Sequence, residues 1–283
     1  MLVPQALQLF MNSVEREVRK QKREKQWKML HRVAAHLPFG IRRYLFRAVH
    51  TRFGSHFRFF VSGGAYLAPQ LGLFWEEMGF RVIQGYGATE CAPSISANPM
   101  HEHNIYSVGK PLPDVEVRIA ADHEILVSGP NVALGYWKNP EMTALSFSDG
   151  CYSTGDLGYL DKHNNLYLKG RKKNLIVLAN GMNVYPEDVE NVLQGFPDIK
   201  ESVIIGLTEN NSGPDIHAIL LMEDASKAKG IIQQTNKRVA SHQQIKSFTI
   251  WPEQDFPRTN TLKVKRQEIL TILPEIRKQK KEG

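Results

Sequence analysis

The chain of 283 residues is 42% hydrophobic and 23% charged, with a formal charge of +7 and a pI of about 9.3. It is long enough to bury one large core or two smaller ones, and its composition is ordinary for a globular protein. The basic balance permits contact with nucleotides, nucleic acid or acidic lipid head groups, and does not choose among them.

The sequence argues against three classes of protein. No apolar run is long enough to span a bilayer, and the first residues lack the basic start and apolar core of a signal peptide. The two cysteines, Cys91 and Cys151, form no CxxC pair, so we expect neither a disulfide framework nor a metal cluster. A cytoplasmic protein fits these features.

Residues 1–56 are predicted to be a basic helical lead-in. Apolar spacing predicts one helix from Val14 to about Ala35, capped by Ser13, and a second from Ile41 to Arg52. The outer face of the first helix carries many cations (Arg16, Arg19, Lys20, Lys22, Arg23, Lys25 and Lys28). Such a run is usually a solvated face; nucleic-acid binding and peripheral contact with an anionic membrane are the alternatives.

A different pattern begins at Phe57. A buried strand at 57–61, a helix at 69–78 and a strand at 81–84 predict an α/β layer with a parallel sheet. Short strands and turns follow between about 115 and 168, with a hairpin that joins 157–160 to 166–168 across residues 161–165. The fold class is therefore α/β with α+β elements.

A second α/β rhythm follows Lys173. Strands are expected at 175–178, 202–206, 216–222 and 248–251, and helices from Pro186, at 228–240 and at 265–280. We place the domain boundary within 171–174, which gives domains of 1–171 and 172–283.

The segment from Gly85 to Glu90 combines the parts of a nucleotide site. Tyr86 offers a flat ring for a base, Thr89 a hydroxyl for phosphate, and Glu90 a carboxylate for Mg²⁺, a hard cation that takes oxygen ligands. Gly85-x-Gly87 is not the dinucleotide fingerprint, since Glu90 stands where the third glycine belongs. A tight turn after a strand is the ordinary explanation of the two glycines.

Four other positions carry weaker signals. The turn Ser62-Gly63-Gly64-Ala65 lets the backbone approach a ligand closely. The carboxylate of Asp156 can accept hydrogen bonds from both ribose hydroxyls. The guanidinium of Arg171 can donate several hydrogen bonds to ribose or phosphate. Lys263 lies in a basic loop and would neutralise charge on an α-phosphate. Taken singly, each is more simply a turn residue or a solvated cation.

Together and in this order, these segments resemble the adenylate-forming superfamily, and within it bacterial long-chain fatty acid–CoA ligases. The resemblance covers nearly the whole chain from about residue 10, and further motifs support it (Ser107–Pro111, Gly129–Val132, Leu134–Pro140 and Pro186–Glu190). It implies the C-terminal part of a large AMP-binding domain, with a partial parallel sheet and a small β-rich subdomain, followed by a small mobile C-terminal domain.

The resemblance also implies substrates and roles. ATP with Mg²⁺ activates a long-chain fatty acid, and CoA accepts it. Tyr86 stacks on adenine, Thr89 contacts phosphate and Glu90 binds Mg²⁺. Lys263 is the catalytic lysine of the adenylation step. Asp156 and Arg171 hold the ribose, Lys173 is the hinge, and Gly181 faces CoA.

Two departures from the family pattern affect the expected activity. Residues 1–62 contain no phosphate-gripping loop, and Leu262 replaces the glycine that usually precedes the catalytic lysine. We therefore expect a truncated or split gene product with little activity alone, complemented by a separate N-terminal chain. The alternatives are another adenylate-forming ligase fragment and a non-catalytic nucleotide-binding or interaction module.

Overall fold

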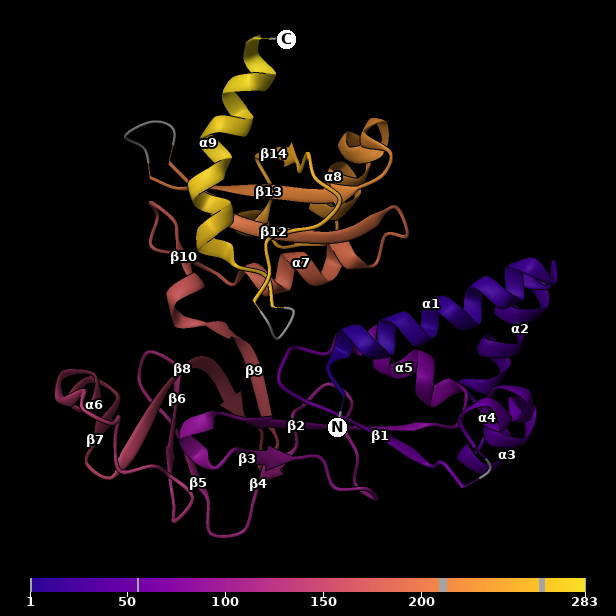
Figure 1. The fold of residues 1–283 in the computed structure, drawn as a ribbon, viewed down its shortest axis with the longest axis horizontal. Coiled ribbons are helices and arrows are strands. Elements are labelled where there is room, and N and C mark those ends of the chain that lie inside the picture. The colour runs from indigo at the N-terminus through magenta and orange to yellow at the C-terminus, as the bar shows by residue number, and fades with distance from the viewer. Residues whose placement is uncertain (1, 55, 209–212, 260–262, 283) are drawn as a thin grey trace. The chain divides into compact units, whose positions relative to one another are not determined.

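The computed structural model describes all residues except 1, 55, 209–212, 260–262 and 283. The chain divides into two compact units, residues 1–168 and 169–283. Both are mixed α/β, as expected (Figure 1). The division lies inside strand β9 (Leu166–Arg171), whereas the boundary proposed from the sequence follows Arg171. No described helix is long and apolar enough to cross a membrane.

The N-terminal helices differ from their prediction. Two antiparallel helices, α1 (Pro4–Lys20) and α2 (Glu24–Ala34), replace the single helix expected from 14 to 35. The chain reverses at Lys22, whose φ of 55° is left-handed, so Leu7 and Ala34 enter the same core cluster. Ser13 lies inside α1 and caps no helix. The second predicted helix is also divided, at Phe46, into α3 (Phe39–Leu45) and α4 (Arg47–Phe53).

The first unit contains a sheet with the order β1-β2-β3-β4. Strands β1 (Phe59–Ser62) and β2 (Arg81–Gly87) are parallel and are connected through α5 (Pro69–Glu77). Strands β3 (Ser94–Ala97) and β4 (Lys110–Pro111) continue the sheet in antiparallel fashion. The carboxyl ends of β1 and β2 therefore lie side by side, where ligands of parallel sheets bind.

A β-rich part follows in the same unit. Its strands are β5 (Glu116–Ile119), β6 (Glu124–Ser128), β7 (Phe147–Ser148), β8 (Cys151–Leu160) and β9. They form a sheet with the order β5-β6-β8-β7, and β9 also pairs with β8. Helix α6 (Pro140–Ser146) precedes β7. The predicted hairpin of β8 and β9 is confirmed. Its turn is held by Asp161, whose carboxylate accepts hydrogen bonds from the backbone of His163 and Asn165, at 2.8 and 2.9 Å.

The second unit is built on a sheet of β12 (Ile199–Leu207), β13 (Asp215–Met222) and β14 (Ser247–Ile250). Alternate side chains of β12 and β13 enter two different cores: Ile204 and Leu220 pack with helices α7 (Pro186–Gln194) and α8 (Ala228–Asn236), while Ile205 and Leu221 pack with α9 (Arg266–Glu282). A two-stranded piece, β10 (Ile176–Val177) and β11 (Asn183–Val184), completes this unit.

A buried ion pair holds α9 against this sheet. The Nη2 of Arg266 lies 2.7 Å from both carboxylate oxygens of Glu190 on α7. Both groups also bond to the backbone of Ile204 on β12, because Arg266 donates to its carbonyl at 3.0 Å and Glu190 accepts from its N–H at 2.7 Å. Burial alone would lower the pKa of Arg266, but Glu190 raises it, so the guanidinium stays charged.

The Asp161 turn generates a pH prediction. Hydrogen bonds, above all from the Asn165 side chain, lower the pKa of Asp161 from 3.8 to about 2. A folded-state pKa below the unfolded one stabilises the hairpin above about pH 4. That contribution disappears as the pH falls through about 2. An NMR titration of the carboxyl carbon should therefore find Asp161 still ionised at about pH 3.

Two variants test this assignment. Asn165→Ala removes the side-chain donor at 2.9 Å, so the midpoint should rise toward the ordinary value for aspartate. His163→Ala keeps the backbone donor and should leave the midpoint low. An ordinary midpoint in the unchanged protein would contradict the turn geometry.

The Glu190–Arg266 pair generates a stability prediction. Arg266→Ala leaves a buried carboxylate with one donor, and should lower the free energy of unfolding of residues 169–283 by about 3 kcal/mol. Denaturation can be followed by NMR of fluorotryptophan, because Trp251 is the one tryptophan in this unit.

A neighbouring pair supplies the control. Lys265 and Glu268 form an exposed ion pair at 3.1 Å, so Lys265→Ala should cost less than about 1 kcal/mol. Adding Glu190→Gln to Arg266→Ala should recover part of the loss, since the unpaired charge is removed. If Arg266→Ala and Lys265→Ala lower the free energy of unfolding equally, the buried pair stabilises the unit no more than an exposed one.

Candidate nucleotide-binding site

The predicted site residues of the first unit gather around the end of the parallel strands. Gly63, Gly64 and Ala65 follow β1, Gly85, Tyr86 and Gly87 end β2, and Thr89 and Glu90 lie in the short 3-10 helix Thr89–Cys91. Ser62 is paired in register with Gln84, directly before the glycine of β2. The glycine turn after β1 and the glycine-containing end of β2 are therefore adjacent in space.

Close packing explains two of these glycines. A Cβ at Gly87 would overlap the carbonyl of Pro93, and Gly64 has a φ of 80°, in the left-handed region that favours glycine. The amide of Gly63 donates to the carbonyl of Leu2 at 3.2 Å, and the amide of Leu2 donates to Val61 at 2.7 Å. A short N-terminal segment thus pairs with the outer edge of β1.

Tyr86 and Asp156 meet although they are far apart in the sequence. The hydroxyl of Tyr86 donates to Oδ2 of Asp156 at 2.7 Å, and both residues are 9% exposed. Tyr86 belongs to the core beneath the β-rich part, and the hydrogen bond gives the buried carboxylate a partner. The contact fixes the orientation of both side chains.

The backbone before Asp156 is held by its own contacts. Gly155 has a φ of 68° and donates to Oε1 of the buried Glu124 at 2.9 Å. The hydroxyl of Thr154 donates to the carbonyl of Ile125 at 2.8 Å. Thr154-Gly155-Asp156 is thus a fixed turn in the middle of β8, where a glycine is needed for the positive φ.

Glu90 has a partner that the sequence did not reveal. The hydroxyl of Tyr136 donates to Oε1 of Glu90 at 2.7 Å. Burial, and then the bond to Glu90, raise the pKa of Tyr136; burial and the charge of Glu90 also raise the pKa of the nearby Tyr152. Both tyrosines keep their protons, so Tyr136 serves as a donor. The motif that contains Tyr136 was the available signal for this role.

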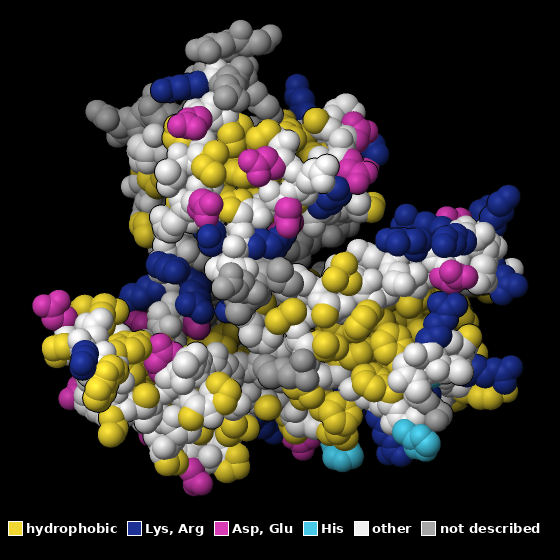
Figure 2. Space-filling view, in the orientation of Figure 1, with side chains coloured by type: hydrophobic (Ala, Val, Ile, Leu, Met, Phe, Trp, Pro, Cys, Tyr) yellow, Lys and Arg dark blue, Asp and Glu magenta, His cyan; other side chains and the backbone are white. Residues whose placement is uncertain are grey.

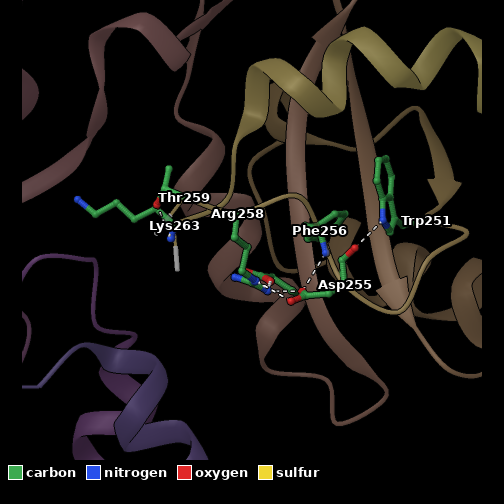
Figure 3. A network of polar contacts seen from close by, with 7 residues as sticks. Trp251, Asp255, Phe256, Arg258, Thr259 and Lys263 are labelled. Carbon is green, nitrogen blue, oxygen red and sulfur yellow. Dashed lines mark hydrogen bonds and ion pairs between the residues drawn. The ribbon is translucent and has the colours of Figure 1, made fainter. Parts of the chain in front are cut away.

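Lys263 lies in a hairpin of the second unit (Figure 3). The amide of Lys263 donates to the hydroxyl of Thr259 at 3.1 Å, and the amide of Thr259 donates to the carbonyl of Lys263 at 2.8 Å. Arg258 and Val264 form an isolated bridge. The side chain of Lys263 is exposed and points away from the Arg258 contacts. Leu262, the departure noted in the sequence, lies outside the described residues.

Arg258 anchors the first strand of this hairpin. Its guanidinium donates to Asp255 at 2.8 and 2.5 Å and to Glu201 on β12 at 2.5 Å. Hydrogen bonds from Arg258 to Asp255 are the main cause that raises its own pKa. Asp255 is itself fixed, because its carbonyl accepts from the indole of Trp251 at 2.9 Å.

The remaining predicted residues also lie in the second unit. Arg171 ends β9, Lys173 lies in the 3-10 turn Lys172–Asn174, and both are exposed. Gly181 lies in the turn between β10 and β11 with a φ of 78°. The structure thus brings Tyr86, Asp156 and the strand ends together in one unit, and Lys263 with Thr259 in the other.

No group of three His, Cys, Asp or Glu in the described residues is placed to hold a metal ion. A depression of about 410 Å³ lined by Pro111, Asp114, Glu116 and Asn164, among others, contains none of the predicted site residues.

Comparisons with known proteins find relatives for both parts of the chain. Residues 1–137 match the model of the AMP-binding enzyme family, and residues 173–275 match the model of the AMP-binding enzyme C-terminal domain. The long-chain-fatty-acid–CoA ligase FadD15 of Mycobacterium bovis is 33% identical in an alignment of 258 positions, which covers 80% of this chain and 42% of the relative.

Two other relatives extend the comparison. The 2-succinylbenzoate–CoA ligase of Geobacillus kaustophilus is 34% identical over 79% of this chain and 48% of its own. The o-succinylbenzoate CoA synthetase of Bacillus subtilis, solved with its acyl-adenylate intermediate, superposes with a TM-score of 0.69 at 28% identity, over 80% of this chain and 49% of that one. The chain thus spans less than half the length of these relatives. It belongs to the AMP-binding enzyme family, whose two domain models match its two halves in order.

Proposed function

We propose that this chain is the C-terminal portion of an ATP-dependent long-chain fatty acid–CoA ligase. The hydrogen bond between Tyr86 and Asp156 carries the proposal, because it joins two motifs 70 residues apart that would serve a single nucleotide. Similarity to a long-chain-fatty-acid–CoA ligase over 80% of the chain supports this acid class.

The nucleotide would lie at the carboxyl ends of β1 and β2. Tyr86 would stack on adenine, and the glycine turn at 63–65 and the glycine-containing end of β2 at 85–87 would let backbone amides approach the ligand. Asp156 and Arg171 would bind the ribose, since a carboxylate accepts from two hydroxyls and a guanidinium donates in a fork. Thr89 would contact phosphate.

Glu90 fits the Mg²⁺ that this chemistry needs. A single carboxylate is sufficient, because Mg²⁺ in such sites takes one or two carboxylates, and phosphate oxygens and water complete its shell. Tyr136 holds Oε1 of Glu90 at 2.7 Å, which orients the carboxylate as a whole. Bound Mg²⁺ would neutralise phosphate charge.

Lys263 would act in the first of two steps. A carboxylate oxygen of the acid bonds to the α-phosphorus of ATP while the bond to pyrophosphate breaks, and the ammonium of Lys263 stabilises the charge that develops. In the second step, the sulfur of CoA bonds to the acyl carbon, its thiol proton is lost, and AMP leaves with the electron pair. Lys173 would be the hinge and Gly181 would approach CoA, so that one cavity serves both steps.

The whole activity is proposed for the chain together with a second polypeptide. Relatives are more than twice as long as the part matched here, and residues 1–62 lack the phosphate-gripping loop. We propose a separate N-terminal chain that supplies it, and a cytoplasmic complex. The chain alone would show little ligase activity, because the leaving pyrophosphate would lack stabilisation.

A different acid is the second candidate. Identity of 34% to a 2-succinylbenzoate–CoA ligase favours an aromatic acid. A fatty acid and 2-succinylbenzoate should therefore be offered in turn as the acid in acyl-adenylate formation, and faster turnover of 2-succinylbenzoate would favour this second candidate. A non-catalytic nucleotide-binding module would bind AMP and turn over neither acid.

AMP binding is the first test. AMP should raise the melting temperature of the unit with residues 1–168, because a ligand of the folded state stabilises it, by about 2.7 kcal/mol at a hundred times its Kd. Asp156→Asn keeps an acceptor for Tyr86 but removes the charge, and should abolish the shift. Asp114→Asn is the matched control, an exposed aspartate whose φ of 62° suits asparagine. No shift in the unchanged chain would refute nucleotide binding.

The half-reactions test Lys263. With a polypeptide that supplies the phosphate loop, Lys263→Ala should slow acyl-adenylate formation by a factor on the order of 100 or more. Thioester formation from synthetic acyl-adenylate should be nearly unchanged. Lys265→Ala, an exposed lysine two positions away, should preserve both rates. Equal loss in both lysine variants would contradict the role of Lys263.

A further inference from the structure

The strongest concentration of charge in the chain lies outside the proposed nucleotide site. Residues 14–52 contain twelve lysines and arginines and three glutamates, a formal charge of +9 compared with +7 for the whole chain. Figure 2 shows Lys and Arg side chains gathered over the outer end of α1 and α2. The rest of the chain therefore has a net negative charge, and the basic surface is local.

The outer face of α1 mixes cations with an aliphatic side chain. Leu9, Arg16 and Lys20 are all exposed and follow one another at spacings of seven and four residues, so they share one stripe of the helix. Leu9 is 67% exposed. Leu7 and Val14 are buried on the opposite face, so this stripe is free of any packing role.

Helix α2 repeats the arrangement. Lys25, Met29 and Arg32 are exposed at spacings of four and three residues, and Met29 is 68% exposed. His31 and Ala34 are buried on the inner face. Met29 thus lies between two cations of α2, and Leu9 lies N-terminal to the two cations of its stripe on α1. The apolar inner faces of both helices are already used by the core.

Most of the exposed cations on α1 and α2 that are named above form no ion pair with a described residue. Within the described part of the chain, Arg19 and Glu15 form an ion pair at 3.7 Å on α1. No ion pair with a described residue is found for Arg16, Lys20, Lys25 or Arg32. An anionic partner would therefore meet cations that are already available.

We propose that the outer faces of α1 and α2 bind the surface of an anionic lipid bilayer. Phosphate head groups would contact the cations, and Leu9 and Met29 would enter the boundary between head groups and acyl chains. Nucleic acid explains the charge but gives no use to exposed aliphatic side chains, since its backbone is bound by cations and polar donors. This surface is independent of the proposed nucleotide site.

Vesicle sedimentation tests the proposal with the 283-residue chain. The chain should bind vesicles of phosphatidylglycerol in phosphatidylcholine and should not bind pure phosphatidylcholine. Replacing Arg16, Lys20 and Lys25 by glutamine should weaken partitioning at low salt by a factor on the order of 100, because each cation near such a surface contributes roughly fivefold. Added salt should weaken binding of the unchanged chain in the same way.

A matched triple variant controls for net charge. Lys229, Lys237 and Lys246 are exposed lysines of the second unit, and their replacement by glutamine should preserve vesicle binding. An equal loss of vesicle binding in the two triple variants would contradict the assignment of lipid binding to α1 and α2. So would equal binding to both kinds of vesicle.

The aliphatic side chains are tested separately. Leu9→Gln with Met29→Gln changes no charge and alters no buried residue, so circular dichroism and melting should be unchanged. This variant should lose several-fold in vesicle binding while retaining the salt dependence. Unchanged vesicle binding, or tighter retention on generic DNA than on anionic vesicles, would overturn the assignment to lipid.

Discussion

The functional interpretation depends on the hydrogen bond from Tyr86 to Asp156. A carboxylate that is 9% exposed must have partners, and the tyrosine hydroxyl at 2.7 Å is one of them. The bond therefore holds the end of β2 against the middle of β8. Removing either group would leave the other buried polar group without this partner.

In the second unit, the lysine proposed to act in adenylation is held differently. Arg258 and Arg266 fasten the two ends of the Lys263 hairpin to β12 and α7 through buried or half-buried carboxylates. Lys263 itself is exposed between these two anchors. Such an arrangement fixes the backbone from which the ammonium extends and leaves the side chain free to follow a substrate, which suits a group that would act in one step of two.

Sequence patterns predicted the elements whose signals are local. The β8–β9 hairpin, helix α5 and strands β12, β13 and β14 follow apolar periodicity and turn residues, and the structure confirms them, whereas the short strand β11 was not predicted. The reversal at Lys22 was missed because no glycine or proline marks it. The bonds of Tyr136 to Glu90 and of Arg266 to Glu190 were missed because the partners are 46 and 76 residues apart, and only the folded chain brings them together.

The two cysteines have a practical consequence. Cys91 and Cys151 are buried, and burial raises the pKa of the Cys91 thiol to about 11, so little reactive thiolate forms at neutral pH. The natural thiols should therefore stay silent toward maleimide dyes. One engineered cysteine on each unit would then suffice to test by fluorescence energy transfer whether the units move relative to each other, without first removing the native pair.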